Sequence, residues 1–100
     1  MNKNFLKQAQ QMQARLAKVQ EELETETVEA SSGGGAVKVV ATGKQTIDSI
    51  EIDPIAVDPE DVDILQDMIL TAVNDALTQS QELVQKRIGA ITGGMKLPGM

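Results

Sequence analysis

The chain has 100 residues and a net charge of −6, and it contains no cysteine, no histidine and a single aromatic residue, Phe5. This composition allows one domain with a thin core, so oligomerisation is expected. It excludes disulfides, zinc–thiolate sites and acid–base catalysis by histidine. The N-terminus carries charge but no apolar block behind it, so no signal peptide is expected. No apolar run approaches the ~20 residues of a membrane span, and a cytoplasmic protein is predicted.

Residues 3–24 are predicted to form one long helix. Neither Gly nor Pro interrupts this segment, and its apolar residues recur at alternating spacings of four and three, as in a heptad. We call these residues the seam: Phe5, Ala9, Met12, Leu16, Val19 and Leu23. At a rise of 1.5 Å per residue the helix would be roughly 33 Å long, too long to stay within a compact body. The seam is expected to pack against a second helix, from the same chain or from a second copy.

Three short strands are predicted next. Val37, Val39 and Ala41 share one face of a strand, and Ile50 and Ile52 share one face of the following strand. The turn at 43–46 joins these two strands as a hairpin, and residues 25–31 form a third strand. The glycines at 33–35 lack the lysine and hydroxyl of a phosphate-binding loop, so a flexible connector is predicted there.

A second long helix is predicted after Pro54, with Asp58 as its N-cap and Pro59 as its first residue. It should end near Ile88, with Gly89 as one possible stop and the glycines at 93–94 as a firm one. Its apolar stripe comprises Val62, Leu65, Ile69, Ala72, Ala76 and Leu83, broadened by Met68, Val73 and Val84. The predicted fold class is therefore α+β, in the order α-β-β-β-α, as a single domain over residues 1–100 with a flexible tail at 93–100.

The acidic segment before this helix is a weak candidate for a metal site. Asp58, Glu60, Asp61 and Asp63 could supply oxygen ligands, but the central glycine and the terminal glutamate of a calcium loop are missing. Helix capping explains these acids better. No set of nucleophile, base and orienting group is recognisable, so no catalytic residue, metal, cofactor or small-molecule substrate is predicted.

Charge is distributed unevenly along the chain. Residues 1–20 carry four cations and no acid, residues 21–30 carry five glutamates, and residues 54–85 carry seven acids and no cation. Residues 86–100 are basic again. At ~100° per residue, the first four cations lie on the helix face opposite the seam. We call them the basic stripe: Lys3, Lys7, Arg15 and Lys18. Such a stripe can follow a phosphate backbone, although many charged helix faces are only solvated.

Four segments together resemble the YbaB/EbfC family of bacterial nucleoid-associated proteins. They are the helix "KQAQQMQARLAKVQEEL", the hairpin "GGGAVKVVATGKQTIDSIEIDP", the helix "DPEDVDILQDMILTAVNDAL" and the tail "TGGMKLPGM". The resemblance covers almost the whole chain, and its most specific part is the combination of "IEIDP", "NDA" and "GGMKLPG".

This resemblance implies an α-β-β-β-α homodimer shaped like tweezers, whose long helices form prongs that bind double-stranded DNA at the nucleoid. It also implies the residues that would face DNA: Lys3, Lys7, Arg15, Lys18, Lys86, Arg87 and Lys96. Weak sequence specificity and an effect on chromosome organisation and gene expression are expected. The alternative is a protein-interaction or chaperone-like clamp, in which the lysines only keep the prongs soluble.

Overall fold

The structure is a computed structural model, which describes residues 3–93. A long helix, α1 (Lys3–Leu23), leads into the strands β1 (Thr27–Ser32), β2 (Val37–Thr42) and β3 (Ile47–Ile52), and a second long helix, α2 (Val62–Thr92), ends the described chain. Short 3-10 turns, Gly33–Gly35 and Pro54–Ala56, follow β1 and β3. The predicted α-β-β-β-α order is confirmed. The predicted tail beyond Gly93 lies outside the described residues.

The three strands form an antiparallel sheet in the order β1-β2-β3. β1 pairs with β2 from Thr27↔Thr42 to Ser32↔Val37, which confirms the third strand and shows its partner. β2 pairs with β3 through Val37↔Ile52 and Val39↔Ile50, with a register shift between Val40 and Ala41. Because opposed residues point to the same face, most apolar side chains of the three strands lie on one side of the sheet, and Val40 lies on the other.

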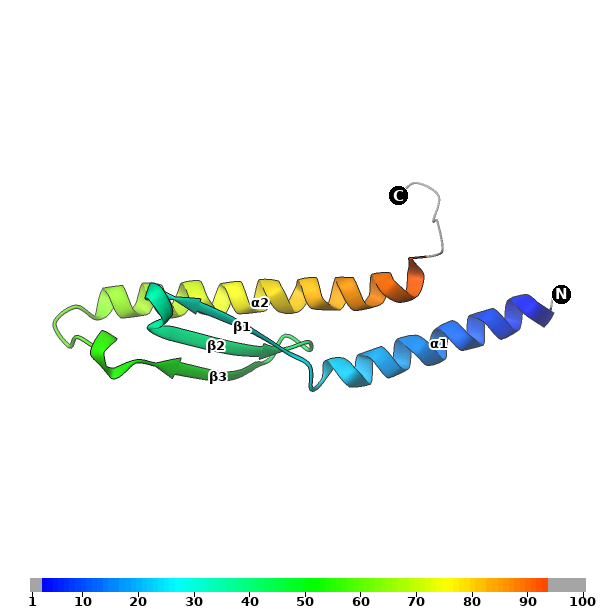
Figure 1. The fold of residues 1–100 in the computed structure, drawn as a ribbon, viewed down its shortest axis with the longest axis horizontal. Coiled ribbons are helices and arrows are strands. Elements are labelled where there is room, and N and C mark those ends of the chain that lie inside the picture. The colour runs from blue at the N-terminus through cyan, green and yellow to red at the C-terminus, as the bar shows by residue number, and fades with distance from the viewer. Residues whose placement is uncertain (1–2, 94–100) are drawn as a thin grey trace.

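α2 lies along that apolar side, mainly over β1 and β2 (Figure 1). The core between them is small, and it consists of Ala30, Val37, Val39, Ala41, Ala72 and Ala76. Alanine on the helix lets it approach the sheet closely, and the buried Ser80 continues the same row one turn later. The Ser80 hydroxyl donates a hydrogen bond to the Thr42 carbonyl at 2.6 Å, so α2 is also attached to the end of β2.

The turn between β1 and β2 is well defined, so the prediction of a flexible connector at 33–35 was wrong. Its three glycines all have positive φ, between 61° and 96°, a conformation that side chains disfavour. A Cβ on Gly33 would lie 2.2 Å from the Met68 Sδ, so any other residue there would force the Met68 side chain to move. The Ser32 hydroxyl donates to the Met68 carbonyl at 2.5 Å and fixes the same end of the sheet to the helix.

α2 differs from its predicted boundaries at both ends. It begins at Val62, and the Asp58 carboxylate instead accepts a hydrogen bond from the Glu60 amide at 2.9 Å, forming a turn ahead of the helix. At the other end the helix passes through Gly89 to Thr92. No helix within residues 3–93 is long and apolar enough to cross a membrane.

The chain is elongated, with extents of 70 × 28 × 15 Å and a radius of gyration of 19.3 Å. A compact chain of this length would have a radius of gyration of about 13 Å. The difference arises because α1 leaves the sheet and extends antiparallel to α2, beyond the end of that helix (Figure 1). One end of the molecule is therefore a packed α/β body and the other is formed by α1 and the last turns of α2.

Candidate nucleic-acid interface

The basic stripe lies on the part of α1 that extends from the body. The side chains of Lys3, Lys7, Arg15 and Lys18 are all exposed. Both ion pairs found within residues 3–93 belong to Arg87, so none of the four stripe cations is neutralised by a described carboxylate. The stripe thus presents four solvated positive charges along one face of a helix.

Only the base of α1 is packed. Val19 and Leu23 are 8% and 2% exposed, whereas Phe5 near the tip is 65% exposed. Among the seam residues only Val19 and Leu23 are buried, whereas Met12 and Leu16 are half-buried. The outer part of the seam remains a shallow apolar groove along α1, lined by Phe5, Gln8, Ala9, Met12, Gln13 and Leu16.

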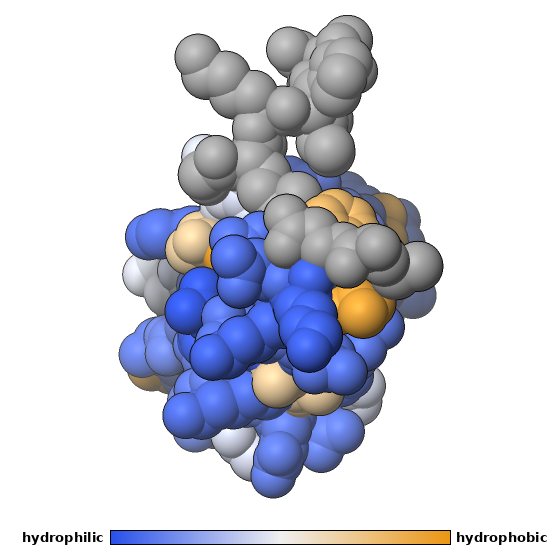
Figure 2. Space-filling view, turned by 90° about the vertical axis from the view of Figure 1, so that its right-hand side faces the viewer, coloured by the Kyte–Doolittle hydropathy of each residue, from blue (hydrophilic) through white to orange (hydrophobic). Residues whose placement is uncertain are grey.

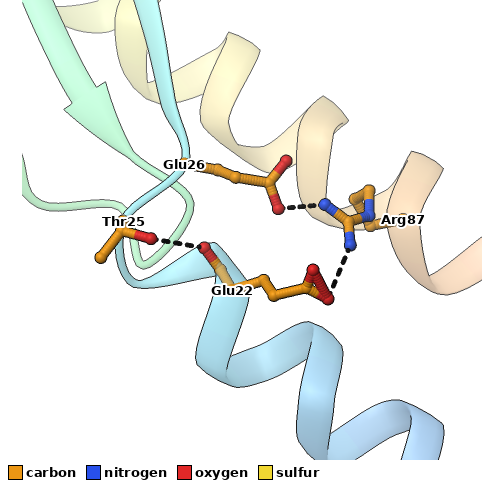
Figure 3. A network of polar contacts seen from close by, with 4 residues as sticks. All are labelled: Glu22, Thr25, Glu26 and Arg87. Carbon is orange, nitrogen blue, oxygen red and sulfur yellow. Dashed lines mark hydrogen bonds and ion pairs between the residues drawn. The ribbon is translucent and has the colours of Figure 1, made fainter.

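The two other predicted cations on α2 differ from each other. Lys86 is exposed and makes no ion pair within the described residues. The Arg87 guanidinium instead binds two carboxylates, one from Glu26 and one from Glu22, the latter at 3.3 Å (Figure 3). Hydrogen bonding to Glu26 raises the pKa of Arg87 further above its already high usual value. The remaining predicted site residue, Lys96, lies outside the described residues.

We call Arg87, Glu22 and Glu26 the clasp. Sequence analysis missed it, because the partners are 61 and 65 residues apart and no local pattern connects them. The one available signal was the unexplained excess of glutamate at residues 21–30, directly after the basic stripe.

The charge is separated along the long axis of the molecule. The turn after β3 and the first part of α2, residues 53–67, carry six carboxylates and no cation, and they lie at the opposite end from the tip of α1 (Figure 1). Viewed from the α1 end, the surface is mostly hydrophilic, with a few apolar side chains among the polar ones (Figure 2). A polyanion is therefore attracted to the α1 end and repelled by the other.

No group of three or more acidic side chains that could hold a metal ion occurs in the part of the chain that the structure describes. The arrangement offers exposed cations on a projecting helix, which suits binding to a regular array of phosphates. The fold and this surface define a small α+β protein with a charged helical arm.

A model of the YbaB/EbfC DNA-binding family matches residues 1–95, and the chain belongs to this family. Curated relatives named "Nucleoid-associated protein" include one from Desulforamulus reducens, 61% identical over the whole chain and 94% of its own length. Another, from Moorella thermoacetica, is 61% identical over 99% of this chain and 94% of its own length. The crystal structure of an uncharacterized Helicobacter pylori protein shares the fold, with a TM-score of 0.65 and 23% identity over 78% of this chain and 90% of that one.

Proposed function

We propose that this protein is a homodimeric, nucleoid-associated protein of the bacterial cytoplasm that binds double-stranded DNA with low sequence specificity. The observation that carries the proposal is the basic stripe, whose cations are exposed and unpaired within the described structure. Together with Lys86 they would contact phosphates, and by covering DNA the protein would influence chromosome organisation and gene expression. Family membership and the names of the relatives support DNA as the partner.

Low specificity is expected from the chemistry of the stripe. Three of its four cations are lysines, which contact phosphates as point charges rather than reading base edges in pairs of hydrogen bonds. The stripe contains no aromatic residue that could stack on bases. The energy of binding would therefore come mainly from counterion release, which is insensitive to sequence.

Dimerisation is supported by apolar surface that the single chain leaves uncovered. β3 is an edge strand that α2 barely reaches, and Ile50 and Ile52 on the core side of the sheet are 44% and 36% exposed. The turn that follows adds Ile55 and Val57, which are 92% and 48% exposed. We call these four residues the β3 apolar surface. A second copy could cover it and enlarge the thin core.

Gel-shift titrations with unrelated duplexes at two salt concentrations test DNA binding, and sedimentation tests the dimer. Similar affinities for the different duplexes, falling steeply with salt, are expected.

The exposed outer seam around Phe5 favours a second candidate function, a clamp that holds an apolar polypeptide. Weak DNA binding together with salt-insensitive capture of an unfolded protein would favour the clamp instead.

A further inference from the structure

The clasp lies at the joint between α1 and the rest of the molecule. Glu22 is in the last turn of α1, Glu26 follows the helix, and Arg87 lies on α2 (Figure 3). One guanidinium therefore ties both sides of the α1–β1 junction to α2. Arginine suits this position because its planar fork can bind two carboxylates at once, which the single ammonium of lysine does less well.

Few other contacts restrain the direction of α1. The buried Val19 and Leu23 hold its base, and the Gly43 amide donates to the Glu26 carbonyl at 3.0 Å. The backbone at the joint is also closed by a hydrogen bond from the Thr25 hydroxyl to the Glu22 carbonyl at 3.2 Å. Residues 3–18 have no buried side chain. The contacts at the base of α1 therefore set the orientation of its outer part.

A small rotation at the joint would move the basic stripe a long way. Lys3 lies roughly 28 Å along the helix from Glu22, so a tilt of about 20° would displace the tip by roughly 10 Å. That displacement exceeds the ~3 Å length of a hydrogen bond or close ion pair to a phosphate. The alignment of several stripe cations on one duplex thus depends on how firmly the joint is held.

We propose that Arg87 is a positioning residue rather than a DNA-contacting one: through Glu22 and Glu26 it fixes the direction of α1, and so places the basic stripe for binding. The expected effect on DNA binding rests on the proposed function, whereas the expected effect on the direction of α1 does not. The positioning role also gives Glu22 and Glu26, two of the five glutamates that follow the stripe, a role other than repelling DNA.

Residual dipolar couplings of the backbone amides test the positioning without DNA. In the wild-type protein the couplings of α1 and α2 should fit one alignment tensor, because the two helices move as one body. In Arg87→Gln, and in the double variant Glu22→Gln with Glu26→Gln, the couplings of α1 should shrink or fit a different tensor. Arg87→Lys should be intermediate.

Two matched controls distinguish the loss of the clasp ion pairs from the loss of a nearby charge. Lys86→Gln removes a neighbouring cation that has no ion pair in the described structure. Glu21→Gln with Glu24→Gln removes two exposed carboxylates of the same segment that have no described partner. Both controls should retain the wild-type fit to one tensor. Unchanged α1 couplings in Arg87→Gln, with the sheet intact, would overturn the proposal.

The effect on DNA is measured by comparing the two glutamate double variants, which carry the same net charge. If the clasp positions the stripe, Glu22→Gln with Glu26→Gln should bind several-fold more weakly than Glu21→Gln with Glu24→Gln at the same salt concentration. Equal or tighter binding would mean that Arg87, once released, contacts phosphate itself, and the positioning role would be lost. Failure of the wild-type protein to bind DNA would refute the proposed function, while the couplings would still decide whether the clasp holds α1.

Discussion

At the scale of single residues, the turn after β2 packs closely against the end of α1. A Cβ on Gly43 would lie 2.7 Å from both the Cδ2 and the backbone oxygen of Leu23. Gly43→Ala should therefore force the turn and the helix apart, at a cost of about 1–3 kcal/mol in the free energy of unfolding.

Gly89→Ala is the matched control for this substitution, because a Cβ there meets nothing within 4 Å. Because Gly89 lies within the last turn of α2, the substitution should raise stability by up to about 1 kcal/mol. Urea unfolding of the two variants measures both effects. Equal stabilities would show that the contact between Gly43 and Leu23 is unimportant.

Single residues also show where prediction from sequence is limited. The pattern Asp58-Pro59-Glu60 suits a helix N-cap, yet it equally suits the turn that the structure contains, in which the Asp58 carboxylate accepts from the Glu60 amide. Both motifs use the same short-range hydrogen bond, so the local sequence does not distinguish them. Arg87 illustrates the other limit, because its partners are set by the packing of α1 against α2 and not by any neighbour in the sequence.

At the scale of elements, periodicity predicted the two long helices and the strands β2 and β3, whereas β1 rested on a weak alternation in residues 25–31. The spacing of the seam residues predicted α1, and the alternation at Val37, Val39 and Ala41 predicted the buried face of β2. α2 is longer than expected because a single exposed glycine costs a helix only about 1 kcal/mol, which the rest of a 31-residue helix tolerates. Periodicity did not indicate how much of the seam would be covered, since burial depends on which partner lies opposite.

The uneven burial of α1 predicts a difference between its two ends. Leu23→Ala should lower the free energy of unfolding by about 2–5 kcal/mol, because it leaves a cavity where the helix meets the body. Phe5→Ala should change it by less than about 0.5 kcal/mol, because that ring is 65% exposed. Thermal or urea unfolding compares the two. A large loss in Phe5→Ala would indicate that the outer seam is covered in solution.

At the scale of the whole molecule, the small core and the β3 apolar surface predict that a dimer forms through the sheet edge. Ile50→Asp places a charge on that surface and should shift the protein from dimer to monomer. Ser49→Asp is the control, because it adds the same charge to an exposed position on the opposite face of β3. Sedimentation equilibrium at micromolar concentration distinguishes the two masses. If the Ile50→Asp protein remains a dimer, the interface lies outside the β3 apolar surface.

The separation of charge along the molecule predicts how DNA affinity depends on salt. If the dimer neutralises about seven phosphates, the slope of log affinity against log salt is about −6, at roughly −0.9 per phosphate. Changing Lys7, Arg15 and Lys18 together to glutamine removes three cations per chain from the stripe without altering the seam. The triple variant should stay folded, because glutamine is a good helix former, and it should bind DNA far more weakly with a visibly shallower slope.

Lys38 and Lys44 provide the control for this last prediction. Both are exposed and lie outside α1: Lys38 is on the solvent face of β2, and Lys44 is in the turn after it. Changing both to glutamine lowers the positive charge of the chain while leaving the stripe complete. If binding depends on the stripe rather than on net charge, this double variant keeps a slope close to that of the wild-type protein. A triple variant with wild-type affinity and slope would mean that the stripe is only a solvated helix face. It would favour the clamp, with the exposed seam on the opposite face of α1 as the surface that binds a partner.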